Sequence, residues 1–221
     1  MSVNYHAYQC RRYLLQDYEA ICEQWRGYFQ NYQPERAVSI LKLDADEYYL
    51  YLQYFQKPYR LRLKDGVLEK KENQEWSDLI YFNEAMACYH LLYYVKDMPL
   101  ITGKWVPNTS LGGAASRSEM PYDPLFTPFA RRFTGRCAAL DQICRQLSGI
   151  KRSKGDLCYE FEAFPQVHLQ LIFYDADEDF PAQANVLVDD HVTDFIHFET
   201  TGCLISDLFE QIEKTDTQDQ S

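Results

Sequence analysis

The chain has 221 residues, of which 46% are hydrophobic and 25% charged, a composition typical of a folded globular protein. Its formal net charge of −11 opposes binding to nucleic-acid backbones. No stretch of about 18 apolar residues and no N-terminal apolar run is present, so we expect neither a membrane span nor a signal peptide. The seven cysteines are scattered without a Cys-x-x-Cys pair, which predicts reduced thiols and a cytoplasmic protein.

Hydrophobic spacing in the first half alternates between helix-like and strand-like segments. A recurrence of apolar residues every three to four positions predicts a helix, and short apolar runs bounded by turn residues predict strands. Helices are expected over 5–30 and 76–95, and strands over 38–43, 49–55 and 59–63. The Asp65-Gly66 pair marks a turn after the third strand.

The second half begins with a segment rich in glycine and proline and then returns to regular periodicity. Strands are expected over 104–106, 157–161, 166–174 and 184–188, and helices over 126–147 and 200–212. The polar residues 213–221 are expected to be a disordered tail. Together these elements predict an α+β fold with mostly antiparallel sheet packed with about four helices, in a single domain over 1–212.

A short internal repeat raises an alternative organisation. The tetrapeptide Asp-Ala-Asp-Glu occurs at 44–47 and again at 175–178, each time after an expected strand. The repeat is compatible with a duplicated β-β-β-α unit. However, hairpin tips select aspartate in any case, so four matching residues can arise without duplication.

The acidic stretch around the second copy, "YDADEDFP" at 174–181, has three interpretations. Asp175, Asp177 and Asp179 match the first ligand positions of a calcium EF-hand loop, but Phe180 replaces its glycine and Val186 its glutamate. A looser metal site, a catalytic acid pair and a solvated turn remain as alternatives. Clustered carboxylates attract hard cations, whereas water screens them in a turn.

Two histidines follow this stretch within an acidic segment. His191 and His197 lie among four carboxylates, and with Asp177 and Glu178 they form a candidate metal site. The same residue types could instead form an acid–base pair. The alternative without function is a polar surface loop between a strand and a helix.

A basic segment stands out against the acidic remainder of the chain. Residues 131–154 contain seven basic residues and one acid. Arg131, Arg132 and Arg136 form a candidate patch for an anion or an acidic partner protein. The alternative is a solvated helix end, because cations favour the C-terminal turns of helices.

Several segments together resemble a known family, catalogued as domain of unknown function 3786 and found in anaerobic bacteria and archaea. The resemblance covers residues of about 35–212. The segments that carry it are Leu91-Leu92, Thr102 to Trp105, Gly112-Gly113, Phe164 to Val167, Asp177 to Pro181, Leu187 to Asp189, and Glu199. It implies a relation to accessory domains of anaerobic metallocofactor metabolism.

The resemblance and the residue pattern together predict a non-catalytic accessory module that binds a small ligand, a metal or a metallocofactor protein. The candidate ligand-binding residues are Trp105, Gly112, Gly113, Asp177, Glu178, Phe180 and Glu199. Pro181 restricts Phe180 to an extended conformation, from which its ring could turn inward as an anchor. The alternatives are an enzyme with a carboxylate–histidine acid–base pair and a protein-interaction module. Neither a cofactor nor a catalytic residue is identified by the sequence.

Overall fold

The computed structural model describes residues 18–111 and 123–219, and its first half is an antiparallel sheet with helices beside it. A helix spans 18–28, α2 spans Glu35–Leu41 and α3 spans Phe82–Tyr94. The strands are β1 (Tyr49–Tyr54), β2 (Lys57–Arg62), β3 (Leu68–Glu72) and β4 (Glu75–Ser77). They follow one another in the sheet in chain order, as a meander.

The second half is a five-stranded antiparallel sheet in the order β5-β9-β8-β7-β6. Its strands are β5 (Trp105–Pro107), β6 (Ile150–Arg152), β7 (Leu157–Phe164), β8 (Val167–Tyr174) and β9 (Gln183–Asp189). Its helices are α4 (Phe126–Phe133), α5 (Cys137–Gln146) and α6 (Thr200–Asp219), with short 3-10 turns at Asn108–Ser110 and Val192–Asp194.

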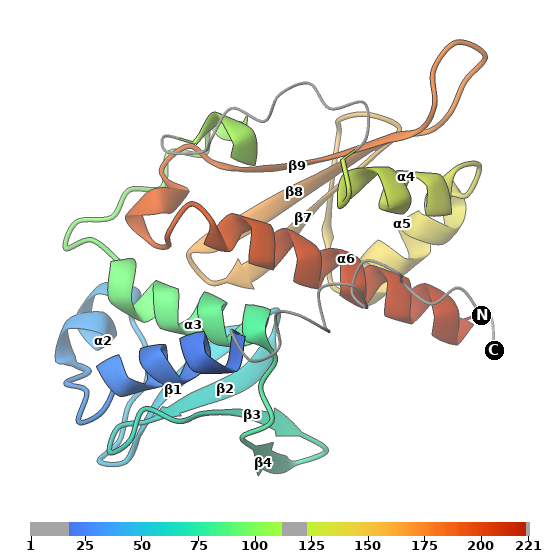
Figure 1. Ribbon diagram of the computed structural model, residues 1–221. Coiled ribbons are helices and arrows are strands. Elements are labelled where there is room, and N and C mark those ends of the chain that lie inside the picture. The colour runs from blue at the N-terminus through green and yellow to red at the C-terminus, as the bar shows by residue number, and fades with distance from the viewer. Residues whose placement is uncertain (1–17, 112–122, 220–221) are drawn as a thin grey trace.

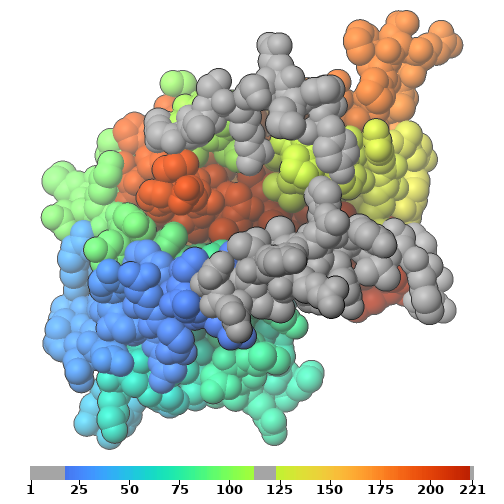
Figure 2. Space-filling view, in the orientation of Figure 1, coloured from blue at the N-terminus to red at the C-terminus, as the bar shows by residue number. Residues whose placement is uncertain are grey.

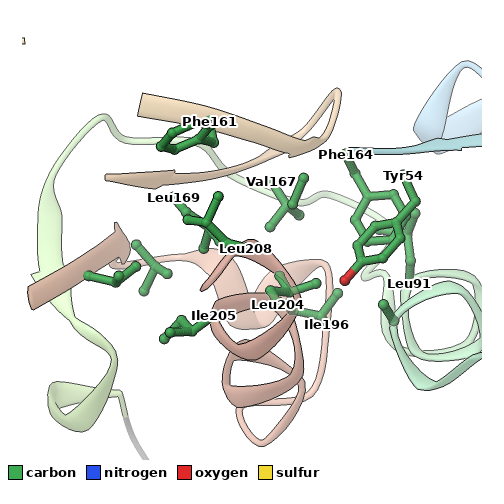
Figure 3. Packing of buried hydrophobic residues seen from close by; sticks show 14 of the residues in the cluster. Tyr54, Leu91, Phe161, Phe164, Val167, Leu169, Ile196, Leu204, Ile205 and Leu208 are labelled. Carbon is green, nitrogen blue, oxygen red and sulfur yellow. The ribbon is translucent and has the colours of Figure 1, made fainter. Parts of the chain in front are cut away.

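Helices α3 and α6 pack against each other between the two sheets (Figure 1). Figure 3 shows Leu204 and Leu208 of α6 beneath Val167 and Leu169 of the second sheet. Tyr54 from the first sheet lies in the same cluster of buried residues, which runs without a break through both halves. Burial of this apolar surface is the main stabilising contribution to the fold.

The expected α+β fold with mostly antiparallel sheets is confirmed, but one predicted strand is wrong. Residues 35–41 form α2, because Ala37 and Leu41 lie four positions apart and are both buried on one helical face. The first Asp-Ala-Asp-Glu copy therefore follows a helix, and the second follows β8. The two copies thus do not occupy equivalent positions.

Other boundaries also differ from those expected. The expected helix over 76–95 begins only at Phe82, because Glu75–Ser77 pairs with β3. The expected helix over 126–147 is two helices, since Gly135 between them has φ 68°. The expected tail is helical through Asp219, and the Asp216 side chain is buried.

The loop between β8 and β9 projects from the body of the protein (Figure 1). Figure 2 shows the same orange segment standing clear of neighbouring atoms at one corner of the molecule. Within the described residues, no helix is long and apolar enough to span a membrane.

Candidate functional site

The projecting acidic loop is closed by its own hydrogen bonds. Asp177 Oδ1 accepts from the amides of Asp179 (2.9 Å) and Phe180 (2.7 Å), and the Asp177 amide donates to the Phe180 carbonyl (3.0 Å). The Glu178 side chain is exposed. Phe180 is 65% exposed, so the inward anchor expected for its ring is not formed. Asp177 therefore serves as a turn-forming residue in this structure.

Asp175, at the base of the same loop, is hydrogen-bonded to other parts of the protein. Its Oδ1 atom accepts from the Gly135 amide at 2.8 Å, at the break between α4 and α5. The Gly135 amide, together with the Ala176 amide and the Cys137 thiol, lowers the Asp175 pKa although burial opposes this. Asp175 thus ties the β8–β9 loop to the helix pair beneath it.

His191 belongs to a different cluster, centred on a buried carboxylate. Asp194 accepts from Lys96 Nζ (2.6 Å) and from the Leu100 amide (3.1 Å), and it lies 3.3 Å from His191 Nδ1. Burial alone would raise the pKa of Asp194, but Lys96, the Leu100 amide and His191 together lower it. The cluster fastens the segment after α3 to the end of the second sheet.

The four candidate metal ligands do not meet. Asp177 and Glu178 precede β9, whereas His191 and His197 follow it. Seven residues of strand span roughly 20 Å, so the two pairs lie at opposite ends of β9. Across the described ranges, no group of three or more His, Cys, Asp or Glu side chains is arranged to hold a metal ion. The same distance separates the carboxylates from the imidazoles in the acid–base hypothesis.

Two of the segments that carry the family resemblance form a backbone joint. Asp189 Oδ2 accepts from the amides of Thr102 (3.0 Å) and Gly103 (2.6 Å), while Asp189 Oδ1 accepts from the His191 amide (2.9 Å). Trp105 begins β5 directly after this joint, is half-buried and pairs with Asp189 in the sheet. This joint positions the strand edge. The candidate residues Gly112 and Gly113 lie outside the described residues.

His197 and Glu199 lie beside a group of aromatic rings at the start of α6. His197 Nδ1 is 3.5 Å from Glu199 Oε2, and its ring is 5.1 Å from the Tyr94 ring. His90 Nδ1 is 2.6 Å from the Thr200 hydroxyl, while His90 Nε2 is buried and has no hydrogen-bond partner among residues 18–111 and 123–219. Because Nε2 is shielded from solvent in this arrangement, a ligand could reach it only after the surrounding rings moved.

Internal ion pairs occupy much of the basic segment. Arg132 and Arg136 both pair with the buried Asp216, at 2.8 and 2.5 Å, and Arg131 is exposed. Residues 151–157 border an open concavity of about 820 Å3. Its described lining comes from this one hairpin alone. Of the three predicted arginines, only Arg131 forms no ion pair with the residues that the structure describes.

A second concavity lies between the two halves of the fold. We call it the inter-sheet groove: about 250 Å3 bounded by the β1–β2 turn, the end of α5, β7 and α6. Its apolar side consists of the buried Phe161 and Leu208 and the half-buried Phe55 and Leu147. Figure 3 shows Phe161 on the side of β7 that faces Leu208 of α6. Its polar lining residues are Gln56, Lys57, Gln146, Ser148, Glu162 and Gln211.

The β1–β2 turn that forms one wall of the groove has an unusual backbone. Phe55 and Gln56 have φ values of 44° and 61°, so both central residues of this two-residue hairpin are left-handed. Such turns favour Asn-Gly, because a left-handed backbone conformation costs a residue with a side chain roughly 1–2 kcal/mol. A hydrogen bond of 2.9 Å from the Phe55 amide to the Ala163 carbonyl holds the turn against β7.

The opposite wall has a second left-handed residue, at the end of α5. Ser148 has φ 59°, and its amide donates to the Arg145 carbonyl at 2.9 Å. The Gly149 amide donates to the Cys144 carbonyl at 2.8 Å. This pair of bonds is the Schellman motif, which normally has glycine where Ser148 stands. The serine thus places a hydroxyl in the groove at a cost in strain.

No residue of the inter-sheet groove was among the site residues predicted from sequence. They come from four elements spread over residues 55–211, so no local spacing brings them together. The one local signal is the absence of a glycine or asparagine in the tight turn Tyr-Phe-Gln-Lys at 54–57, and that signal is informative only once the hairpin is known.

Comparison with known proteins gives one match. The family described as Domain of unknown function (DUF3786) matches residues 33–210. No curated protein and no solved structure matches the chain. The match covers most of the chain and includes both sheets, the Asp189 joint and every lining residue of the inter-sheet groove except Gln211. The chain therefore belongs to the family Domain of unknown function (DUF3786).

Proposed function

We propose that the protein is a non-catalytic module that binds a small organic ligand in the inter-sheet groove. The observation that carries the proposal is that three residues with strained backbone border this one cavity. Of the seven non-glycine residues with clearly positive φ in the described part of the chain, Phe55, Gln56 and Ser148 line the groove. Strain of this kind persists where the surroundings enforce it, and it gathers at binding sites.

The chemistry of the lining favours binding over catalysis. Among the described residues that line it, Lys57 and Glu162 are the ionisable ones, and none is histidine or cysteine. One carboxylate without imidazole or thiolate offers too few ligands to hold a metal ion. The groove instead combines an apolar side with several hydrogen-bonding groups, which is the usual make-up of a small-molecule site.

The proposal is tested with the full chain labelled with 15N and a set of free amino acids, small amines, carboxylic acids and heterocycles. We expect at least one compound to shift the amide signals of Phe55, Gln56, Ser148 and Gly149 and to saturate. If every compound that binds shifts signals elsewhere, or if none binds at millimolar concentration, the groove is not the site.

A pair of variants separates strain relief from binding. Gln56 and Gln74 are both the second residue of a two-residue hairpin turn, with φ 61° and 69°, but only Gln56 lines the groove. Gln56→Gly and Gln74→Gly should each stabilise the fold by up to about 1 kcal/mol. Only Gln56→Gly should weaken the ligand identified by NMR, and equal effects of the two variants on binding would contradict the proposal.

A second candidate function is docking of a protein partner at the segment after α3. Met98, Leu100 and Ile101 are 85%, 54% and 63% exposed, and exposed apolar side chains so close together favour an interaction surface. Contacts of this type persist at high salt, unlike contacts to surface charges. Capture of a partner that survives high salt and is lost in Met98→Asp would support this function, whereas salt-sensitive capture would count against it.

A further inference from the structure

Six aromatic rings lie in contact where the helix over 18–28, the C-terminal half of α3 and the segment before α6 meet. We call them the ring cluster: Trp25, Tyr28, His90, Tyr93, Tyr94 and His197. Trp25 lies at its centre, with ring centroids 4.6 Å from His90 and 5.1 Å from Tyr93. Tyr28 and Tyr93 are 58% and 53% exposed, and no residue of the cluster lines the inter-sheet groove. The ring cluster is therefore a separate, partly exposed surface.

Cations lie over aromatic rings in other parts of this protein but not over the ring cluster. The Arg60 guanidinium lies 3.9 Å from the centre of the Tyr49 ring and 4.2 Å from that of Trp76. Lys70 Nζ lies 4.8 Å from the Tyr81 ring. Among residues 18–111 and 123–219, none of the contacts between a cation and a ring involves the ring cluster. Aromatic rings attract cations through their negative faces, so this surface is open to a cation from another molecule.

A carboxylate adjoins the exposed rings. The Glu199 side chain is 72% exposed, and its Oε2 atom lies 3.5 Å from His197 Nδ1 within the ring cluster. Burial raises the pKa of Tyr94, and the neighbouring Tyr93 and Glu199 raise it further. Glu199 thus lies within electrostatic reach of both tyrosines, and its negative charge adds to the attraction of the rings for a cation.

The basic side chains on the segments around the cluster are engaged elsewhere. The helix over 18–28 has one, Arg26, whose Nη1 atom lies 3.3 Å from Glu23. The residues after α3, 95–101, have one, Lys96, whose Nζ atom lies 2.6 Å from Asp194. Helix α3 has no lysine or arginine. These segments therefore supply no lysine or arginine to Glu199.

We infer that the ring cluster binds an arginine side chain of a partner protein. The guanidinium group stacks on the exposed tyrosine rings and forms charge-assisted hydrogen bonds with Glu199. Arginine fits better than lysine, because its planar group both stacks on rings and pairs with a carboxylate. Tryptophan and tyrosine are also the residue types that dominate binding at protein interfaces. This inference does not depend on the inter-sheet groove.

The first test compares two probes of the same shape that differ in charge. N-acetyl-L-arginine amide and N-acetyl-L-citrulline amide are titrated into the full 15N-labelled chain at equal, low ionic strength. We expect the arginine compound to shift the amide signals of Tyr93, Tyr94 and Glu199, to saturate, and to bind about tenfold more tightly than the citrulline compound. Equal binding of the two, or no shift of these signals, overturns the inference and leaves the proposed function of the groove untouched.

The second test removes the ring or the charge from the protein. Tyr93→Leu should weaken the arginine compound about threefold, and Glu199→Gln should weaken it about tenfold and reduce its advantage over citrulline. Tyr48→Leu replaces a 62% exposed tyrosine outside the cluster, and Glu178→Gln replaces an exposed glutamate of the β8–β9 loop. Both controls should bind the arginine compound normally. Normal binding by Tyr93→Leu and Glu199→Gln, or equal weakening in a variant and its control, overturns the inference.

Discussion

Asp207 on α6 is a buried carboxyl group whose protonation should control stability. It is 8% exposed and accepts hydrogen bonds from Tyr54 of β1 (2.7 Å) and Asn83 of α3 (2.9 Å). Burial raises its pKa to about 6, with further contributions from the carboxylates of Glu84 and Glu210, although the two hydrogen bonds oppose the rise. The residue thus joins α6 to the first sheet and to α3.

The size of the effect follows from the difference between the folded and unfolded states. The ordinary pKa is 3.8 and the folded value is about 6, and each pKa unit corresponds to about 1.4 kcal/mol. The folded protein holds this proton more tightly than the unfolded chain, so protonation favours folding. The contribution of Asp207 to the free energy of unfolding is highest below pH 3.8, falls by about 3 kcal/mol up to about pH 6, and is constant above that.

Asp207→Asn removes the charge and keeps the shape. The introduced amide can accept from Tyr54, and the Asn83 amide can rotate to accept in turn, so both hydrogen bonds are retained in neutral form. At about pH 7.5 the variant should be more stable than the wild type by about 3 kcal/mol, because the net pKa shift already includes the two hydrogen bonds. At about pH 4.5 the difference should fall to about 1 kcal/mol, because Asp207 is then protonated in the folded protein.

The assay is urea unfolding of both proteins at a series of pH values between about 4.5 and 8. The difference in unfolding free energy is the measured quantity, because other carboxylates then cancel. Asp179→Asn, at an exposed loop position, is the control and should show no pH-dependent difference. A variant that is destabilised at pH 7.5, or a difference that does not grow with pH, would refute this account of Asp207.

Three further predictions concern the other clusters. Burial and then the nearby His197 lower the pKa of His90 to about 4, so its NMR signals should not titrate between about pH 5.5 and 8; a titration there would contradict its burial. Asp216→Ala removes the carboxylate that Arg132 and Arg136 both contact, so urea unfolding should show an unfolding free energy lower by about 2 kcal/mol. The loss is smaller than for a fully buried pair because both arginines are about one-third exposed. Asp189→Ala should cost about 2 kcal/mol and speed hydrogen exchange at Gly103, and unchanged exchange would argue against the joint.

The positions of strands and helices were predicted best where a strand has one buried face or where an element has a clear boundary. The alternation of β1 and the long apolar runs of β7 and β8 were enough to place these strands, and the start of α6 at Thr200 was predicted correctly. Helix α2 was missed because Val38 and Ile40 are β-branched, which favours strands. Tertiary burial of Ala37 and Leu41 overrides that preference.

The candidate site was less predictable than the fold, for a physical reason. Acidic and imidazole side chains close together in sequence suggested a metal site, but β9 separates them once it extends. Conversely, Phe55 and Phe161 are far apart in sequence and both line the groove, where a hydrogen bond joins the Phe55 amide to the Ala163 carbonyl. Sequence spacing can predict sites within one element, whereas a groove between elements depends on how the two sheets are packed.

The segments that carry the resemblance seen in the sequence and the residues that line the groove have different structural roles. Thr102 to Trp105 and Leu187 to Asp189 form a backbone joint, and Asp177 closes a turn. None of these residues lines the inter-sheet groove. The family segments therefore hold the second sheet and its connections in place. The groove is bounded by β7, α6, the β1–β2 turn and the end of α5. None of its described polar residues takes part in the Asp189 joint or in the Asp177 turn. The ligand chemistry of this chain must accordingly be established from the residues that line the groove, and membership of the family alone does not specify it.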